Sequence, residues 1–149
     1  MFGMFIEQRT ADDLDLIRLL DAAFAELVAR YGLEGRSGIG PGAHYLVAVV
    51  DGETVGCVAV QTTGVAGTGE VKRMYVAPAA RGQGIARALL KEVERQAAEL
   101  GHTRLRLVTG HLQPAAVALY ESAGYEPTDP WGTYATRPGT FCYAKPLTA

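Results

Sequence analysis

Apolar and polar residues follow each other along this chain with two different periods, and the order of these periods predicts its secondary structure. Alternation with a period of two is typical of half-buried strands. It predicts strands at 4–9, 44–50, 54–62, 70–76, 103–109 and 140–145. Apolar residues spaced three and four apart indicate amphipathic helices. This spacing predicts helices at 14–31, 85–100 and 114–124.

Caps and turns support these boundaries. Thr10-Ala-Asp-Asp13 resembles a capping box at the start of the first helix, and Tyr31-Gly32 ends that helix. Asp51-Gly52 is a favoured turn pair and predicts a hairpin. Residues 32–43 contain five glycines and one proline, which indicates a mobile loop. The order of elements predicts an α/β (α+β) fold in which helices cover a mixed sheet.

The length and composition fit a single domain over residues 1–149. A chain of 149 residues with 48% hydrophobic residues can bury a substantial core. A net charge of −2 argues against a nucleic-acid partner. The apolar runs are too short for a signal peptide or a membrane span, so we expect a cytoplasmic protein with no membrane partner. Cys57 and Cys142 are isolated thiols, so we expect two buried cysteines and no metal site.

Residues 70–86 carry the strongest chemical signal. An apolar strand runs through a short elbow into a glycine-rich helix start, where unpaired N–H groups and the helix dipole favour an anion. Gly82 and Gly84 let phosphate oxygens approach the main chain, although a Gly-x-Gly pair also occurs in ordinary turns. The following helix and strand complete a strand-helix-strand unit. This unit lacks the third glycine and the acidic residue of a Rossmann dinucleotide site, so we expect a different nucleotide cofactor.

Two longer motifs resemble one protein family. Arg81-x-x-Gly84-x-Ala86 resembles the Arg/Gln-x-x-Gly-x-Gly/Ala signature of the GNAT N-acetyltransferase superfamily, which binds the pyrophosphate of acetyl-CoA. Residues 70–76 resemble the fourth strand of this family, and residues 113–125 resemble its Asn-x-x-Ala-x-x-Leu-Tyr-x-x-x-Gly-Phe segment. The resemblance covers about half of the chain. It implies one GNAT-like domain of six to seven strands, with helices on both faces and splayed central strands that hold acetyl-CoA.

The resemblance also implies which residues contact acetyl-CoA. A main-chain N–H near Tyr75 or Val76 would donate to the thioester carbonyl. Gln113 replaces the family's asparagine; it keeps the amide group but is one methylene longer, and it would contact the pantetheine arm. Arg87 and Lys91 either add charge for the phosphates or are solvated helix cations. The implied contacts are Met74, Tyr75, Val76, Arg81, Gly82, Gln83, Gly84, Ile85, Ala86, Arg87, Gln113 and Tyr120.

Acyl transfer to an amine needs a group that removes a proton. An amine with a pKa of ~10.4 is neutral in only about one molecule in a thousand at pH 7, a handicap of roughly 4 to 5 kcal/mol. Glu70 lies eleven residues before Arg81, where some family members place a catalytic glutamate, so it is the first candidate base. Alternation places four side chains on one strand face: Glu70, Lys72, Met74 and Val76. The alternative is a carboxylate that Lys72 or Arg73 neutralises.

Two histidines are alternative bases, because an imidazole ordinarily titrates near neutral pH. His111 follows the fifth predicted strand beside the expected cleft, and His44 opens the second; either could instead be structural. Tyr120 stands at the position of the family's general acid. Its phenol can donate to the leaving thiolate, and a core tyrosine is the alternative role.

The family resemblance places acceptor choice in the first helix and in loops that here span 31–44 and 126–139. An aromatic pocket with cationic members could form from Arg36, His44, Tyr45, Trp131, Tyr134 and Arg137. Such a pocket fits a small amine that also bears a carboxylate or phosphate. We therefore predict direct acetyl transfer from acetyl-CoA to the primary amine of a small molecule. The alternatives are a protein or peptide N-acetyltransferase and a non-catalytic acyl-CoA sensor; a homodimer also stays open, because a terminal strand can pair across two chains.

Overall fold

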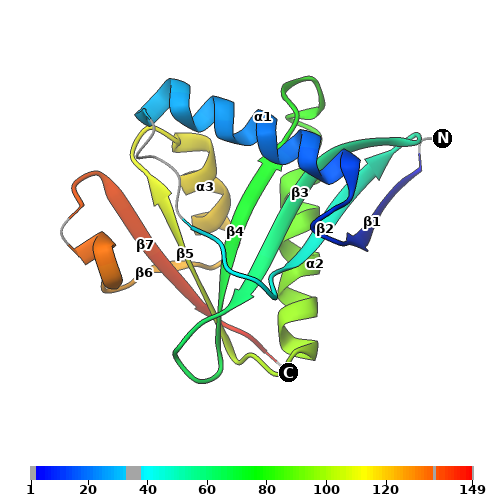
Figure 1. The fold of residues 1–149 in the computed structure, drawn as a ribbon. Coiled ribbons are helices and arrows are strands. Elements are labelled where there is room, and N and C mark those ends of the chain that lie inside the picture. The colour runs from blue at the N-terminus through cyan, green and yellow to red at the C-terminus, as the bar shows by residue number, and fades with distance from the viewer. Residues whose placement is uncertain (1–2, 33–37, 136, 149) are drawn as a thin grey trace.

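The computed structural model describes residues 3–32, 38–135 and 137–148, and its elements follow the predicted order (Figure 1). The strands are β1 (Met4–Arg9), β2 (His44–Val50), β3 (Glu53–Thr62), β4 (Thr68–Val76), β5 (Arg104–Gly110), β6 (Glu126–Pro127) and β7 (Thr140–Pro146). The α-helices are α1 (Leu14–Tyr31), α2 (Ile85–Glu99) and α3 (Pro114–Ser122). Two short 3₁₀ turns are η2 (Pro78–Ala80) and η3 (Gly132–Ala135). The sequence did not predict β6.

The strands form one mixed sheet in the order β1-β2-β3-β4-β5-β7-β6. Every neighbouring pair is antiparallel except β4 and β5, which are parallel because α2 crosses between them. The terminal strand β7 pairs with β5 of its own chain. The predicted mixed sheet of six to seven strands is confirmed.

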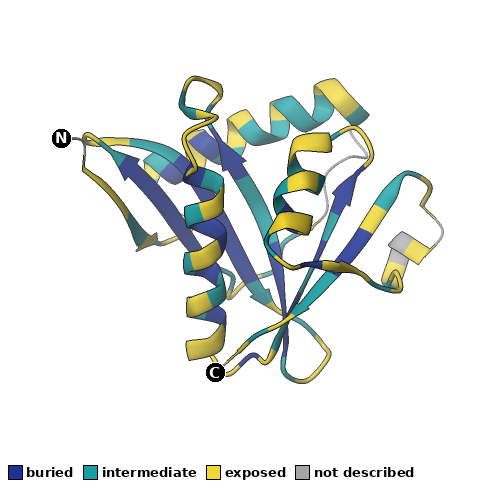
Figure 2. Cartoon of the chain, turned by 180° about the vertical axis from the view of Figure 1, so that it is seen from behind, coloured by how far each residue is buried: buried dark blue, intermediate teal, exposed yellow. Residues whose placement is uncertain are grey.

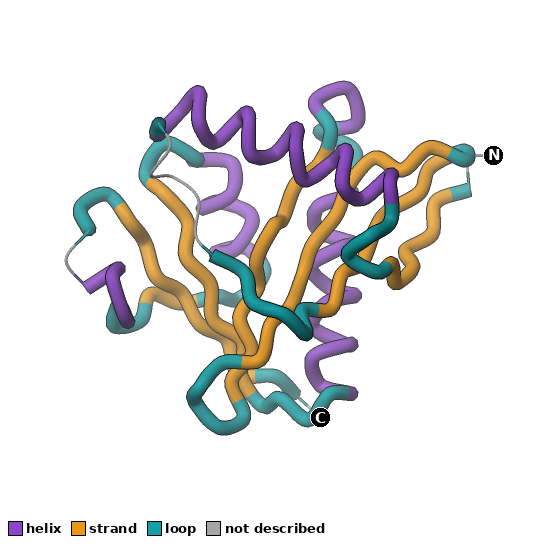
Figure 3. Tube along the Cα trace, viewed as in Figure 1, coloured by secondary structure: helices purple, strands orange, loops and turns teal. Residues whose placement is uncertain are grey.

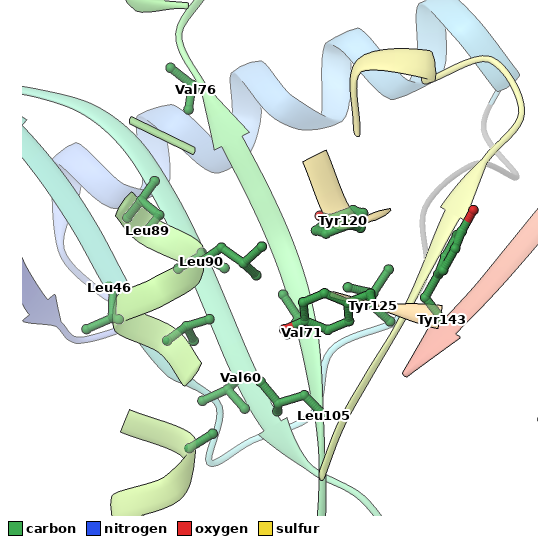
Figure 4. Packing of buried hydrophobic residues seen from close by; sticks show 14 of the residues in the cluster. Leu46, Val60, Val71, Val76, Leu89, Leu90, Leu105, Tyr120, Tyr125 and Tyr143 are labelled. Atoms are coloured by element: carbon green, nitrogen blue, oxygen red, sulfur yellow. The ribbon is translucent and has the colours of Figure 1, made fainter. Parts of the chain in front are cut away.

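Helices cover both faces of the sheet, as the sequence predicted. Leu16 and Leu19 of α1 pack with Val47 and Ala59 on one face. On the other face lie α2 and α3, seen from behind in Figure 2, and they pack over a larger cluster whose side chains Figure 4 shows from close by. The members of that cluster include Val60, Val71, Leu89, Leu90, Leu105 and Tyr120. Burial of such side chains supplies most of the driving force for folding.

The parallel pair β4–β5 separates after a short ladder. The strands pair only at Thr68–Arg104, Gly69–Leu105 and Glu70–Arg106. Beyond these pairs they diverge and open the sheet into a V (Figure 3). The predicted splay of the two central strands is therefore confirmed.

A β-bulge at Arg73 changes which side chains share a face of β4. Cys57 pairs with Tyr75 and Ala59 with Lys72, so β4 carries one extra residue between these pairs. Arg73 has φ 60°, and its carbonyl accepts a hydrogen bond from the Cys57 thiol at 3.3 Å. After the bulge, each side chain of β4 lies on the opposite face of the sheet from the one that simple alternation would give it.

The predicted common face of β4 is therefore wrong. Met74 and Val76 pack into the cluster under α2. Lys72 lies on the opposite face, where its ammonium donates to the carbonyl of Gly38 at 2.5 Å. Glu70 shares that face with Lys72, because both precede the bulge.

The start of α1 also differs from the prediction. The N-cap is Asp13, whose carboxylate accepts a hydrogen bond from the Leu16 N–H at 2.9 Å. Arg9 holds the same carboxylate at 3.0 Å, whereas the hydroxyl of Thr10 donates to Asp12 instead. The predicted capping box is wrong because a closer carboxylate is held in place. Gly32, at φ 76°, ends the helix as expected.

Two further predictions can be compared with the structure. Cys57 and Cys142 are buried free thiols, as predicted. Within the described ranges, no helix combines the length and the apolar character that crossing a membrane requires.

Candidate active site

The elbow between β4 and α2 presents a row of unpaired backbone donors. Gly82 and Gly84 have φ of 81° and 80°, and Gly84 is the N-cap of α2 without a side-chain capping bond. In the part of the chain that the structure describes, no acceptor is recorded for the N–H groups of 82–87. Consecutive free N–H groups at a helix start form an anion seat.

Two arginines flank this seat. Arg81 donates through Nε to the Val76 carbonyl at 2.8 Å, and its other end pairs with Glu26 of α1 at 2.6 Å. Its guanidinium also lies 5.6 Å from the centre of the Tyr75 ring. Arg87 lies in the first turn of α2 and donates to the Ser122 hydroxyl at 2.8 Å. Positive charge is thus held at the mouth of the elbow.

The V between β4 and β5 opens into a cavity of about 410 Å³. Its walls come from α1, β4, the end of β5, α3 and residues 137–140. The predicted site residues that line it are Glu70, Met74, Tyr75, His111, Gln113, Tyr120 and Arg137. From Val71 to Val76, β4 has no ladder partner on its β5 side, so main-chain groups there face the opening.

Tyr120 of α3 forms part of the cavity wall. Its side chain is buried and packs edge-on against Tyr125 at 5.8 Å between ring centres (Figure 4). Burial raises the pKa of the Tyr120 phenol. Among the described residues, its hydroxyl has no hydrogen-bond partner, whereas the Tyr125 hydroxyl donates to Glu94 at 2.8 Å. Tyr120 therefore stays protonated at neutral pH with a donor available to a ligand.

Glu70 lies at the base of the V and holds two cations. Arg106 Nε donates to its Oε1 at 3.0 Å, and Lys72 Nζ lies 3.3 Å from its Oε2. The Glu70 side chain is only 9% exposed. Trp131 covers the Arg106 guanidinium, with 4.3 Å from the guanidinium carbon to the ring centre. Both carboxylate oxygens are thus engaged.

His111 lies immediately after the last ladder pair of β5 and β7. Its backbone N–H and its ring Nδ1 both lie against the carbonyl oxygen of Gly139, at 2.9 and 3.1 Å. The ring also meets Tyr31 edge-on at 6.2 Å. His44, the other candidate base, begins β2; its ring Nδ1 lies 3.5 Å from the side-chain amide of Gln8 on β1, and it is not part of the described cavity wall.

The predicted acceptor pocket is only partly assembled. Arg137 lines the cavity, but Trp131 stacks on Arg106 outside it. Tyr45 is buried in the core beneath α1, so it is not a pocket residue. Arg36 and the Tyr134 side chain lie outside the described residues.

Comparison with known proteins assigns this arrangement to a family. A model of the acetyltransferase (GNAT) domain matches residues 41–127, more than half of the chain. The chain belongs to the GNAT acetyltransferase family. It is 41% identical over 107 residues to an IAA acetyltransferase of Azospirillum brasilense, covering 72% of this chain and 70% of that protein.

Other relatives agree with this assignment. A Klebsiella pneumoniae protein proposed to be an acyl-CoA N-acyltransferase has a solved structure with a TM-score of 0.84 and 31% identity, covering 97% of this chain and 98% of that one. Human N-acetylaspartate synthetase is 40% identical over 85 residues, which are 57% of this chain but only 28% of that enzyme. The GNAT domain described here is therefore an acetyl-CoA-dependent acyltransferase, and acetyl-CoA is its co-substrate. The unpaired N–H row and the open V fit a phosphate-bearing arm.

Sequence reasoning missed several residues of this GNAT site. Arg106 is one of them, because its pairing with Glu70 depends on the parallel register of β4 and β5. Glu26 and Tyr31 are others, since only the crossing of α1 over the open V brings them to the cavity. The charge of Arg106 at an interior position of β5 was the one available signal, and Arg104 begins the same strand with a second charge.

Proposed function

We propose that this GNAT domain transfers the acetyl group of acetyl-CoA directly to the primary amine of a small molecule. The observation that carries the proposal is a single cavity that runs from Tyr120 on the α3 side to α1 on the other, beside a row of unpaired N–H groups. The described residues that line the cavity include neither cysteine nor serine, and both cysteines are buried elsewhere. This composition supports direct attack by the amine rather than an acyl-enzyme on either residue type.

In this proposal the pyrophosphate binds the N–H groups of 82–87 and the charges of Arg81 and Arg87. The main chain of 74–76 contacts the arm and the thioester carbonyl oxygen. Gln113 precedes α3 without a side-chain capping bond, so its amide can bond to the pantetheine arm. The side chain of Ile85 is packed in the core, so this residue contributes only its backbone.

Tyr120 is proposed to stabilise the departing thiolate. Its hydroxyl is protonated and unpartnered among the described residues, and its side chain lines the cavity. Because burial raises the pKa of this phenol, its contribution is a hydrogen bond to sulfur more than complete proton transfer. For the proton on the amine, Glu70 and His111 both line the same cavity.

The acceptor is proposed to carry a carboxylate or phosphate beside its amine. The described cavity wall carries three cations, Lys72, Arg73 and Arg137, and two carboxylates, Glu26 and Glu70. Each carboxylate also pairs with an arginine outside the wall, Glu26 with Arg81 and Glu70 with Arg106. This balance favours an anionic acceptor. The name of the human relative, N-acetylaspartate synthetase, points to such an acceptor for that protein.

The test combines ligand-dependent thermal stabilisation with thiol release. At a concentration of 100 times its Kd, acetyl-CoA should stabilise the protein by about 2.7 kcal/mol, while NADH should cause no shift. Thiol release should then be faster with small amines that carry a carboxylate than with uncharged amines or peptides. Turnover of peptides alone would favour protein acetylation, and a thermal shift without any turnover would favour a sensor.

A further inference from the structure

We propose that His111 is the catalytic base of this enzyme and that its Nε2 takes the proton from the attacking amine. The proposal rests on the proposed acetyl transfer and names the residue that makes the amine reactive. It is carried by the contacts of the imidazole, by the space that two glycines leave for it, and by the ion pairs of Glu70.

The surroundings of His111 fix its tautomer. A carbonyl oxygen can only accept hydrogen bonds, so a ring nitrogen 3.1 Å from the Gly139 carbonyl must carry the proton. The neutral ring therefore has its hydrogen on Nδ1 and a lone pair on Nε2. Among the described residues, none donates to Nε2. The ring thus presents a proton acceptor from the wall of the cavity.

The main chain holds this orientation in place. The carbonyl of Gly139 also accepts the backbone N–H of His111 at 2.9 Å, so one oxygen anchors both the backbone and the ring. This carbonyl comes just before the last ladder pair of β5 and β7, Gly110–Thr140. The group that orients the imidazole is therefore a main-chain carbonyl at the end of the sheet and not another side chain.

Two glycines make the approach possible. A Cβ added to Gly139 would lie 2.4 Å from Nδ1 of His111, and Gly139 has φ 75°, which disfavours other residues. A Cβ added to Gly110 would lie 2.1 Å from the Tyr31 hydroxyl, which accepts the Leu112 N–H at 3.0 Å. Tyr31 in turn packs against the His111 ring. The absence of a side chain at Gly139 and Gly110 thus leaves the space that the imidazole and Tyr31 occupy.

Glu70 is less available than His111. Arg106 holds its Oε1 and Lys72 its Oε2, so protonation of the carboxylate would remove the charge that binds both cations. Glu70 is better placed to hold the base of the V together than to accept a proton. We therefore treat it as a positioning residue.

The amine nitrogen attacks the thioester carbonyl carbon, one N–H proton passes to Nε2, and the C–S bond breaks to leave the amide and the thiolate. The imidazolium returns its proton to solvent, and the thiolate, bonded to Tyr120, is protonated in turn. The other titratable or charged groups on the described cavity wall are Glu26, Tyr31, Glu70, Lys72, Arg73, Tyr75, Tyr120 and Arg137.

The tautomer can be measured without any substrate. The chain has three histidines, so ¹⁵N-detected ring spectra of the wild type and of His111→Gln assign the resonances directly. We expect the neutral His111 ring to carry its proton on Nδ1. A proton on Nε2 would leave no lone pair toward the cavity and would overturn the proposal.

The catalytic role is tested by pH profiles of kcat/KM for the wild type and three variants. His111→Gln should lower kcat/KM by about 10²- to 10⁴-fold at neutral pH and lose the acidic limb of the wild type, with the KM for acetyl-CoA little changed. Glu70→Gln should keep that limb, and His44→Gln, on β2 outside the cavity, should match the wild type. If the acidic limb persists in His111→Gln, His111 is not the base, although the acetyl transfer itself stands. If the wild type is inactive with every amine, the proposed acetyl transfer is wrong.

Discussion

Replacing Tyr120 by phenylalanine should separate catalysis from stability, because this side chain lines the cavity in which we propose acetyl transfer. No described residue bonds to this hydroxyl. Tyr120→Phe should therefore change the free energy of unfolding by less than about 1 kcal/mol, and toward stabilisation if the hydroxyl is poorly hydrated. The same change should lower kcat by ~10- to 1000-fold while acetyl-CoA binding stays nearly constant.

A neighbouring tyrosine gives a matched control. Tyr125 packs in the same cluster, but its hydroxyl donates to Glu94 at 2.8 Å. A hydrogen bond to a charged group contributes about 1.5–3 kcal/mol. Glu94 keeps a second partner in Lys145 at 3.0 Å, so Tyr125→Phe should cost about 1–2 kcal/mol, near the lower end. At about 2–4 °C per kcal/mol, this loss lowers Tm by roughly 2–8 °C.

Urea unfolding gives both free energies, and steady-state thiol release gives kcat and KM for each variant. Tyr120→Phe should be about as stable as the wild type but have a much lower kcat. Tyr125→Phe should be less stable than the wild type but keep a kcat close to it. If Tyr120→Phe unfolds as easily as Tyr125→Phe, the Tyr120 hydroxyl has a structural partner. If its kcat matches the wild type, Tyr120 does not assist the leaving thiolate.

Three further predictions concern the anion seat, the end of β5 and the start of α1. Glu26→Gln should tighten acetyl-CoA binding up to about 5-fold, because it releases Arg81 from its ion pair, and Arg81→Gln should weaken binding about 3- to 10-fold. Calorimetry measures both affinities. If both variants change the affinity in the same direction, Glu26 does not hold Arg81 away from the cofactor. Gly110→Ala should cost about 1–3 kcal/mol in urea unfolding, and less in a Tyr31→Ala background, because its Cβ meets Tyr31. The Leu16 N–H, with help from Arg9, lowers the pKa of Asp13, so its stabilising effect is complete above its unfolded pKa and is lost as pH falls through the folded value. Tm measured from pH 7 to pH 2 should therefore fall less in Asp13→Asn than in the wild type.

The elements were predictable because each depends on local signals. The 3.6-residue repeat of α2 and the Asp51-Gly52 turn need no distant partner, and the structure contains both. The N-cap of α1 was misplaced because Arg9 holds the Asp13 carboxylate, and a salt bridge of this kind leaves no periodic pattern. The two-residue strand β6 is too short to show a period.

The bulge at Arg73 shows why the site was harder to predict than the fold. One extra residue in β4 reverses the faces of Met74 and Val76, and neither Arg73 nor its neighbours in the strand is a glycine or proline that would indicate a bulge. The orientation of His111 depends on Gly139, a residue 28 positions later. Such contacts follow from strand register, which pattern reasoning on one sequence does not provide.

The pair Glu70–Arg106 occupies the last ladder position before β4 and β5 separate, and this place explains how a glutamate can matter without accepting a proton. Both side chains are largely buried, at 9% and 15% exposure, and leaving one such charge unpaired typically costs about 3–5 kcal/mol. Glu70→Gln keeps a hydrogen bond to Arg106 but loses the charge, so the cost should be smaller and the V should become looser. A lower kcat in that variant would then reflect misplaced groups, because approach geometry alone can change rates by about 10². Only the shape of the pH profile, and not the size of the loss, distinguishes a base from a residue that holds the strands together.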